Sequence, residues 1–208
     1  MLSGQKKNWV KKLAFALACT GSLLILPAQA GQKGEPSQFD IYKNWFSAEV
    51  CFSKYCVWRA GTLCKEIPDN VFIIDKPRNI DGIYTFSIHA NNVSQSSLLS
   101  WGTRTKDQIR VKLRVDYGQT REVTVTRELD KAGKTLYWNI PIDDREGFLK
   151  ELQKGTTLRV RIYNDTPVTM SFSLSGAYAV IERMQTENYK DERQKKAINS
   201  DPYFRDEI

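Results

Sequence analysis

The chain has 208 residues, of which 41% are hydrophobic, and its 31 basic and 24 acidic side chains give a formal net charge of +7 at pH 7. A chain of this length and apolar content can bury the hydrophobic core of one domain. A basic balance is typical of nucleic-acid-binding proteins, but the distribution of the charge along this chain argues against that class.

The first thirty residues have the pattern of a signal peptide. Four lysines within residues 6–12 precede an apolar run over 13–26, and Pro27-Ala28-Gln29-Ala30 places small residues where a signal peptidase reads them. We expect cleavage after Ala30 and export across the inner membrane of a bacterium. A membrane anchor is an alternative, although the run is short and contains polar residues. Lipidation at Cys19 is another, although apolar sequence continues beyond that cysteine.

Loss of residues 1–30 changes the charge and the location of the chain. It leaves 178 residues and removes four lysines and no acids, so the net charge falls from +7 to +3. We therefore expect no nucleic-acid partner. No later segment is long and apolar enough to span a membrane, which predicts a periplasmic or secreted protein.

The cysteines of the processed chain are Cys51, Cys56 and Cys64. In an oxidising compartment an odd number predicts one disulfide and one free thiol. The spacing favours Cys51 with Cys56 at the mouth of a hairpin, while the sequence alone leaves the pairing open. A zinc site is the alternative, but the cysteine spacings fit no zinc finger and the single histidine, His89, is remote. We predict no metal and no cofactor.

The sequence pattern from residue 41 onward predicts an antiparallel β-sandwich. We expect residues 31–40 to be a flexible leader and residues 41–184 to form the domain. Residues 109–115 and 158–162 alternate apolar and basic side chains at a period of two, as in half-buried strands. Further strands are expected at 71–74, 84–88, 121–126, 135–140 and 168–174. Turn residues separate them at short intervals, which favours antiparallel pairing.

Two short helices and a charged extension complete the mainly β architecture. Asp143-Asp144 places acidic residues at a helix start, and Gly155 is a natural stop. A second helix is expected to open near Ser175 and to carry Tyr178, Ile181 and Met184 on one apolar stripe. Residues 185–208 have mixed charge and few aliphatic side chains, which predicts an exposed helical extension.

No catalytic constellation is visible, so we do not expect an enzyme. There is no nucleophile elbow, phosphate loop or dinucleotide fingerprint, and His89 stands alone. The notable group is basic: if the strands at 109–115 and 158–162 are neighbours, a positive face forms that attracts anionic material. Its members are Arg110, Lys112, Arg114, Arg159 and Arg161. The alternative is that these are ordinary solvated positions whose charge is neutralised by nearby acidic residues.

The C-terminal half resembles a known family. The run 148–160, which contains Lys154-Gly155-Thr156-Thr157-Leu158-Arg159-Val160, is followed by a strand over 168–174 and by Ser175-Gly176-Ala177. With Asn44-Trp45 and Val50-Cys51 upstream, this order is similar to the invasion-associated locus B family of bacterial periplasmic proteins, over about residues 41–184. The chain departs from that family because the usual later cysteine pair is missing. The resemblance implies an exported, non-enzymatic β-sandwich linked to host invasion or envelope stress.

These observations together predict an exported binding or accessory protein of the bacterial envelope. Its expected partner is another envelope protein or an anionic surface of the envelope or host. Two alternatives stay open: a subunit of an envelope secretion apparatus that docks through its charged tail, and a thiol-dependent envelope enzyme that uses the unpaired cysteine.

Overall fold

The computed structural model describes residues 35–52, 55–78, 82–91, 108–129, 134–163 and 167–186. The predicted signal peptide with its expected cleavage site at Ala30 lies outside the described residues, as do residues 31–34 and the residues beyond 186. Within the described ranges no helix is long and apolar enough to cross a membrane.

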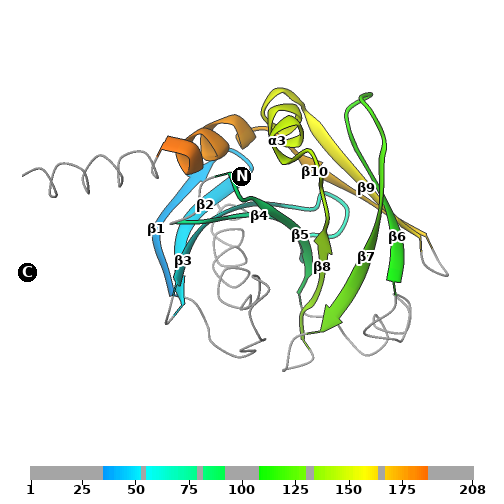
Figure 1. The fold of residues 1–208 in the computed structure, drawn as a ribbon, viewed down its shortest axis with the longest axis horizontal. Coiled ribbons are helices and arrows are strands. Elements are labelled where there is room, and N and C mark those ends of the chain that lie inside the picture. The colour runs from blue at the N-terminus through cyan, green and yellow to red at the C-terminus, as the bar shows by residue number, and fades with distance from the viewer. Residues whose placement is uncertain are drawn as a thin grey trace, which may run out of the picture.

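Within the described residues, ten strands form one antiparallel sheet (Figure 1). They are β1 (Glu35–Tyr42), β2 (Trp45–Phe52), β3 (Tyr55–Leu63), β4 (Asn70–Pro77), β5 (Thr85–Ala90), β6 (Gln108–Val115), β7 (Arg121–Leu129), β8 (Leu136–Ile140), β9 (Thr157–Tyr163) and β10 (Val168–Ser173). Their order across the sheet is β1-β2-β3-β4-β5-β8-β7-β6-β9-β10. The prediction of a mainly β, antiparallel fold is confirmed.

The sheet curves back on itself, so that its two halves face each other across one core. β7 joins the halves, because it pairs with β6 along most of its length and with β8 at its end. The edge strand β10 returns to the chain that leaves β3, where the N–H of Lys65 donates to the carbonyl of Ser171 at 2.8 Å and Cys64 bridges Phe172. Buried residues of both halves therefore form a single hydrophobic cluster.

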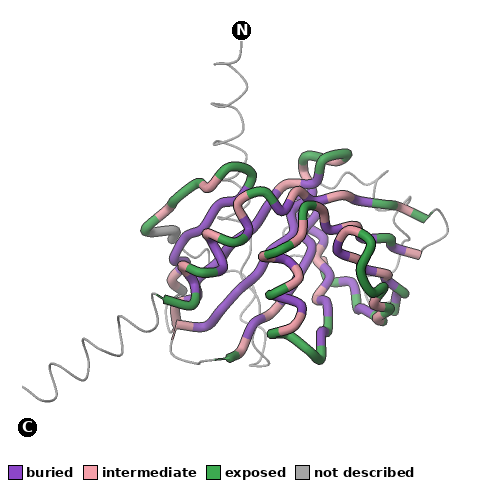
Figure 2. The backbone as a smooth tube through the Cα atoms, turned by 90° about the horizontal axis from the view of Figure 1, so that it is seen from above, coloured by how far each residue is buried: buried purple, intermediate pink, exposed green. Residues whose placement is uncertain are grey.

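The period-two patterns explain which side chains enter that core. In β6 the buried positions alternate with exposed or half-buried ones. In β9 the same alternation holds from Leu158 to Ile162. Figure 2 shows the result, with buried backbone along the central strands and exposed positions gathered at the turns. In β2, β3 and β4 both faces are buried, and the second face carries a smaller apolar cluster that includes Phe46 and Ile73.

The first strand begins earlier than the sequence pattern indicated. Residues 35–40 were expected in a flexible leader, but they belong to β1, which pairs with β2 from Glu35↔Cys51 to Tyr42↔Trp45. The polar composition of this segment hides a strand whose hydrogen bonds are supplied by its neighbour. The register shifts between Ser37 and Asp40, which marks an irregularity near the start of the strand.

Helix α3 (Arg145–Lys154) begins and ends as its sequence predicts. The side chain of Asp144 caps it by accepting from the N–H of Gly147 at 2.9 Å. Three apolar residues of the helix enter the core: Phe148, Leu149 and Leu152. Gly155 ends the helix in extended backbone, and a Cβ at Gly155 would lie 2.3 Å from Val115 and 2.9 Å from Leu174. Close packing, not a left-handed conformation, therefore requires this glycine.

A second helix over residues 177–186 lies at the same end of the sheet as α3 (Figure 1). Its buried stripe consists of Ala177, Val180, Ile181 and Met184. Tyr178, which was expected on that stripe, is 57% exposed, because the four buried positions follow the helical spacing of three and four residues and leave Tyr178 on the opposite side. Arg183 forms an ion pair with Asp40, which ties this helix to β1.

Candidate functional site: a basic face and the pocket beside it

Strands β6 and β9 are antiparallel neighbours, and this pairing gathers the predicted basic residues. Lys112 is paired with Arg161, and Arg114 with Arg159. Arg110 lies in the same row, opposite Tyr163. Since the apolar residues between them point into the core, all five basic side chains occupy the opposite side of the sheet. The structure thus brings the whole predicted set together, and we call it the basic face.

Much of the charge on the basic face forms no ion pair within the described part of the chain. Glu122 on β7 lies 3.4 Å from Arg110 and 3.2 Å from Lys112 and is shared between them. The other three members, Arg114, Arg159 and Arg161, form no ion pair with a described residue. Like charges in directly opposite positions of neighbouring strands cost stability. The face is therefore a positive surface and not a set of mutually neutralised pairs.

Tyr163 lies in the middle of this charge and was missed in the sequence. Its ring is 4.7 Å from the guanidinium of Arg110, 5.4 Å from the ammonium of Lys112 and 5.3 Å from the guanidinium of Arg161. The expected strand ended at Ile162, while β9 extends to Tyr163. If the alternation of buried and outward residues over 158–162 had been continued by one residue, it would have predicted that Tyr163 points outward. Contacts of this kind orient the cations over the ring.

The β6–β7 turn holds a second aromatic residue at the end of the basic face. Asp116 has a positive φ of 48° and accepts from the N–H and hydroxyl of Thr156 at 2.9 and 2.6 Å and from the N–H of Thr157 at 2.9 Å. These bonds, the Thr156 hydroxyl first, hold the pKa of Asp116 below its ordinary value. The next residue, Tyr117, is 92% exposed. The turn is fixed while its aromatic ring faces solvent.

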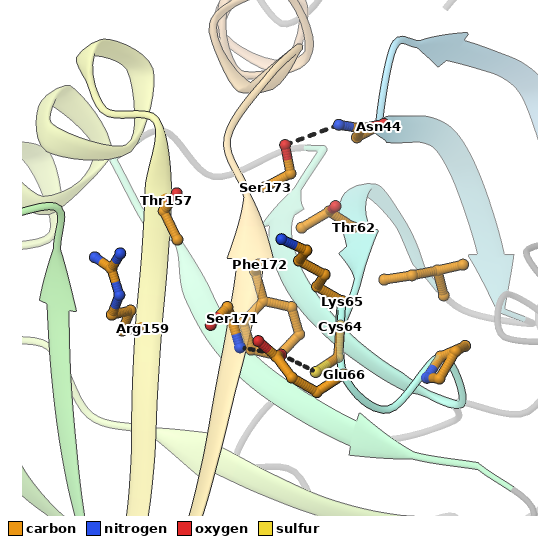
Figure 3. A pocket seen from close by; sticks show the side chains of 12 residues that line it. Asn44, Thr62, Cys64, Lys65, Glu66, Thr157, Arg159, Ser171, Phe172 and Ser173 are labelled. Atoms are coloured by element: carbon orange, nitrogen blue, oxygen red, sulfur yellow. Dashed lines mark hydrogen bonds between the residues drawn. The ribbon is translucent and has the colours of Figure 1, made fainter.

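A pocket of about 600 Å³ adjoins the basic face where β10 meets the end of β3 (Figure 3). Lys65 and Glu66 line it from the β3 side, and Arg159 lines it from β9. The side chain of Asn44, in the β1–β2 turn, donates to the hydroxyl of Ser173 at 2.8 Å. Its lining therefore joins four separate parts of the chain.

Glycine and tryptophan hold the β1–β2 turn against β10 at this pocket. The indole N–H of Trp45 donates to the carbonyl of Ser173 at 2.8 Å. The backbone N–H of Asn44 donates to the carbonyl of Ser175 at 3.2 Å. Gly176 has a φ of +105°, and a Cβ there would lie 2.0 Å from the carbonyl oxygen of Tyr42. This close approach fixes the wall of the pocket that Asn44 provides.

Glu66 and Cys64 are engaged by the protein at one side of the pocket. The carboxylate of Glu66 accepts from the N–H of Ser171 at 2.7 Å and from the thiol of Cys64 at 3.3 Å. Burial opposes ionisation of Glu66, but the hydrogen bonds from Ser171 outweigh it and hold the pKa of Glu66 below its ordinary value. Burial raises the pKa of the Cys64 thiol, and this residue is 3% exposed. Cys64 is thus a protonated thiol at neutral pH.

The other two cysteines form the favoured disulfide. Cys51 and Cys56 are paired residues of β2 and β3 and are joined by a disulfide, while Cys64 is the free cysteine among the described residues. Of the described side chains, Glu49 with Cys51 and Cys56 is the group close enough to hold a metal ion. The disulfide and the ion pair of Glu49 with Arg78 at 2.6 Å occupy these ligand atoms.

His89 lies on β5 with its ring buried. Its Nε2 atom is 2.8 Å from the hydroxyl of Ser87, and its Nδ1 atom has no hydrogen-bond partner among the described residues. Burial, with a smaller effect of Arg59, lowers the pKa of His89 to about 3. The imidazole is therefore neutral at physiological pH. Arg59 itself makes a buried bidentate ion pair with Asp75 at 2.7 Å.

The fold has a counterpart among solved structures. The chain is similar to the crystal structure of invasion associated protein B from Bartonella henselae, with 15% sequence identity and a TM-score of 0.50. The alignment covers 74% of this chain and 99% of that chain. No protein-family model and no curated protein matches the sequence. The resemblance seen in the sequence is thus confirmed at the level of the fold.

Proposed function

We propose that the chain is an exported accessory protein of the bacterial envelope that binds an anionic polymer or surface through its basic face and catalyses no reaction. The observation that carries this proposal is the pairing of β6 with β9, which places three cations without a described carboxylate partner in one patch. Opposed like charges are retained at a cost to stability. An anionic ligand would neutralise them and would be attracted over a distance.

Export is supported by two independent features. Residues 1–30 have the signal-peptide pattern. The Cys51–Cys56 disulfide fits an oxidising compartment such as the periplasm or the exterior. The counterpart from Bartonella henselae is named for association with invasion. A role in host contact or envelope stress is the corresponding proposal for this chain.

The thiol-dependent enzyme has less support. A catalytic cysteine works as a thiolate with a lowered pKa in an accessible position. Burial has the opposite effect on Cys64. The secretion-subunit alternative depends on residues 185–208, most of which lie outside the described residues. A direct test is co-purification of envelope partners with the whole chain and with a chain that ends at residue 186.

Binding to a polyanion tests the proposal most directly. Dextran sulfate and uncharged dextran would be titrated into the purified protein, and the double variant Arg114→Glu, Arg161→Glu would be compared with Arg145→Glu, Lys150→Glu on α3. Both variants change the net charge equally, and the control residues are exposed. We expect binding of dextran sulfate that weakens with salt and is lost in the face variant alone. Equal loss in both variants, or none, would refute the basic face as the binding site.

A further inference from the structure

The pocket beside β10 presents neutral hydrogen-bonding groups. Hydroxyl and amide side chains from β3, β9, β10 and the β1–β2 turn line it: Asn44, Thr62, Thr157, Ser171 and Ser173. Leu63 and Pro68 add apolar surface on the β3 side. A volume of about 600 Å³ lies in the range that small ligands fill. Hydroxyl and amide groups beside a limited apolar surface suit a sugar ring, which has hydroxyls at its edge and C–H groups on its faces.

Two cations give the pocket a preference for a negatively charged ligand. Lys65 is exposed at the β3 side and forms no ion pair with a described residue. Arg159 stands at the β9 side and makes one long hydrogen bond, 3.4 Å, to the carbonyl of Asp116. The carboxylate of Glu66 is already engaged by Ser171 and Cys64. The lining therefore carries positive charge on two separate walls, from Lys65 on the β3 side and from Arg159 on β9.

Arg159 belongs to both the pocket and the basic face. It lines the pocket, and it is paired with Arg114 and lies two positions before Arg161 on β9. Outward residues two positions apart on a strand are separated by about 6.5–7 Å. A row of positive charge thus runs from the pocket along β9. This continuous row of positive charge suits a polymer with repeated negative charges, of which one unit enters the pocket while the next units lie along the basic face.

The aromatic residues argue against the other anionic partners. Nucleic-acid-binding surfaces stack successive bases on several aromatic rings, whereas the ring of Tyr163 is already flanked by Arg110, Lys112 and Arg161. A lipid surface is usually engaged by a band of exposed apolar side chains. Of the described large apolar residues that are exposed, Tyr117 adjoins the basic face, while Ile41 and Tyr178 lie in β1 and in the helix over 177–186.

We propose that the pocket between the end of β3 and strand β10 binds one acidic sugar unit of an anionic polysaccharide whose chain continues along the basic face. Lys65 would hold the acidic group, Arg159 would continue the positive charge from the pocket toward the basic face, and the hydroxyl-lined walls would bind the ring hydroxyls. This inference rests on the proposed polyanion-binding function, from which it differs by naming the ligand class and a second site.

A short uronic-acid oligosaccharide separates the pocket from the face. The probe is a hyaluronan tetrasaccharide, with an uncharged cello-tetraose as its control, titrated by calorimetry into protein expressed from the full chain. Lys65→Gln removes one cation, and Ser171→Leu narrows the pocket. Thr186→Leu is the matched control, because Thr186 is an exposed hydroxyl residue of the helix over 177–186 and lies outside both the pocket lining and the basic face. Circular dichroism and thermal unfolding check that each variant is folded.

We expect the tetrasaccharide, and not cello-tetraose, to bind the wild type. Each pocket variant should weaken that binding about tenfold or more, as expected for loss of a hydrogen bond to a charged group. Thr186→Leu should change it less than about twofold. Addition of the tetrasaccharide to ¹⁵N-labelled protein should shift the amide signals of Lys65 and Ser171. Because the larger side chain in Ser171→Leu can also disturb folding, the shifts of the amide signals in the wild type give a second, independent test of the pocket.

The outcomes distinguish the two proposals. Tetrasaccharide binding unchanged in both pocket variants, or no shift at Lys65 and Ser171, would overturn the pocket proposal even if dextran sulfate still required Arg114 and Arg161. Pocket-dependent tetrasaccharide binding without dextran sulfate binding would support the pocket and overturn the basic face. Binding to phosphatidylglycerol vesicles with no binding of either carbohydrate would overturn both in favour of a lipid surface.

Discussion

Arg114 and Arg159 are paired residues of β6 and β9, so two cations without a described carboxylate partner lie directly opposite each other in the sheet. Lys112 and Arg161, the next outward residues of the same two strands, are also paired like charges. Of these two, Lys112 forms an ion pair with Glu122. Two consecutive rows of like charge are not what cross-strand stability favours. The repulsion between these cations should lower the free energy of unfolding, and this loss of stability can be measured.

Arg114→Gln should stabilise the protein. Removing one charge relieves its repulsion with Arg159 and leaves the outward position polar, so the free energy of unfolding should rise by about 0.2–1 kcal/mol. The gain should shrink at high salt, because screening already weakens the repulsion. Urea unfolding at low and high salt measures both effects, with Lys150→Gln on α3 as the matched charge change. Destabilisation by Arg114→Gln at low salt would mean that Arg114 and Arg159 do not repel each other in the folded protein.

Cys64 should behave as an inert thiol. Because Cys64 is buried and burial raises its pKa, it should react with Ellman's reagent far more slowly than free cysteine at pH 7. After unfolding without reductant, one thiol per processed chain should react at once, since Cys51 and Cys56 are bound in the disulfide. Cys64→Ala tests that this thiol is the one titrated. Rapid reaction in the native state would revive the thiol-dependent enzyme.

His89 should make the protein less stable as the pH falls below about 6.5. Its pKa is about 3 in the folded chain and near 6.5 in the unfolded chain, so the unfolded state binds the proton first. Stability from the neutral ring is complete above pH 6.5 and declines toward pH 3, with a slope of at most about 1.4 kcal/mol per pH unit. Between pH 6.5 and 5, where carboxylates titrate little, the loss should be about 1–2 kcal/mol.

Comparison with His89→Gln isolates that contribution. The variant lacks the titrating ring, so its unfolding free energy should vary little from pH 6.5 to 5 even if its absolute stability is lower. Urea unfolding at intervals of half a pH unit measures the two slopes. Parallel slopes for the two proteins would mean that His89 is not a buried neutral group in the folded protein.

The sequence predicted which residues of the basic face point outward, but it did not predict which strands are neighbours or that Tyr163 belongs to the face. Alternation from Ile109 to Val115 is a local property, and it placed the basic side chains outward correctly. The pairing of β6 with β9 is not local, because three other elements lie between them along the chain. Tyr163 was missed because the last residue of a strand carries too little pattern to set its boundary.

The pocket could not have been predicted by the same reasoning. Its lining comes from the β1–β2 turn, the end of β3, β9 and β10, and it exists because β10 closes back onto Lys65. A polar segment such as residues 35–40 likewise reads as a leader, since its strand conformation depends on hydrogen bonds from β2. The pocket is a consequence of long-range pairing, which residue patterns do not encode singly, whereas the strand at 35–40 belongs to a local hairpin that its polar composition conceals. The Cys51–Cys56 disulfide was predictable because its hairpin is local.

Gly176 should be far less replaceable than Gly82, although both have a positive φ. Alanine at Gly82, with φ +72° and no atom within 4 Å of its Cβ, should cost about 1–2 kcal/mol from backbone strain alone. Alanine at Gly176 would also place its Cβ 2.0 Å from the carbonyl oxygen of Tyr42, because the start of the β1–β2 turn is packed against Gly176. The turn must then move, and the contacts of Asn44 with Ser173 and Ser175 are lost with it. Thermal and urea unfolding should show a cost at Gly176→Ala at least twice that of Gly82→Ala, and equal costs would mean that this turn is not held against the end of β10.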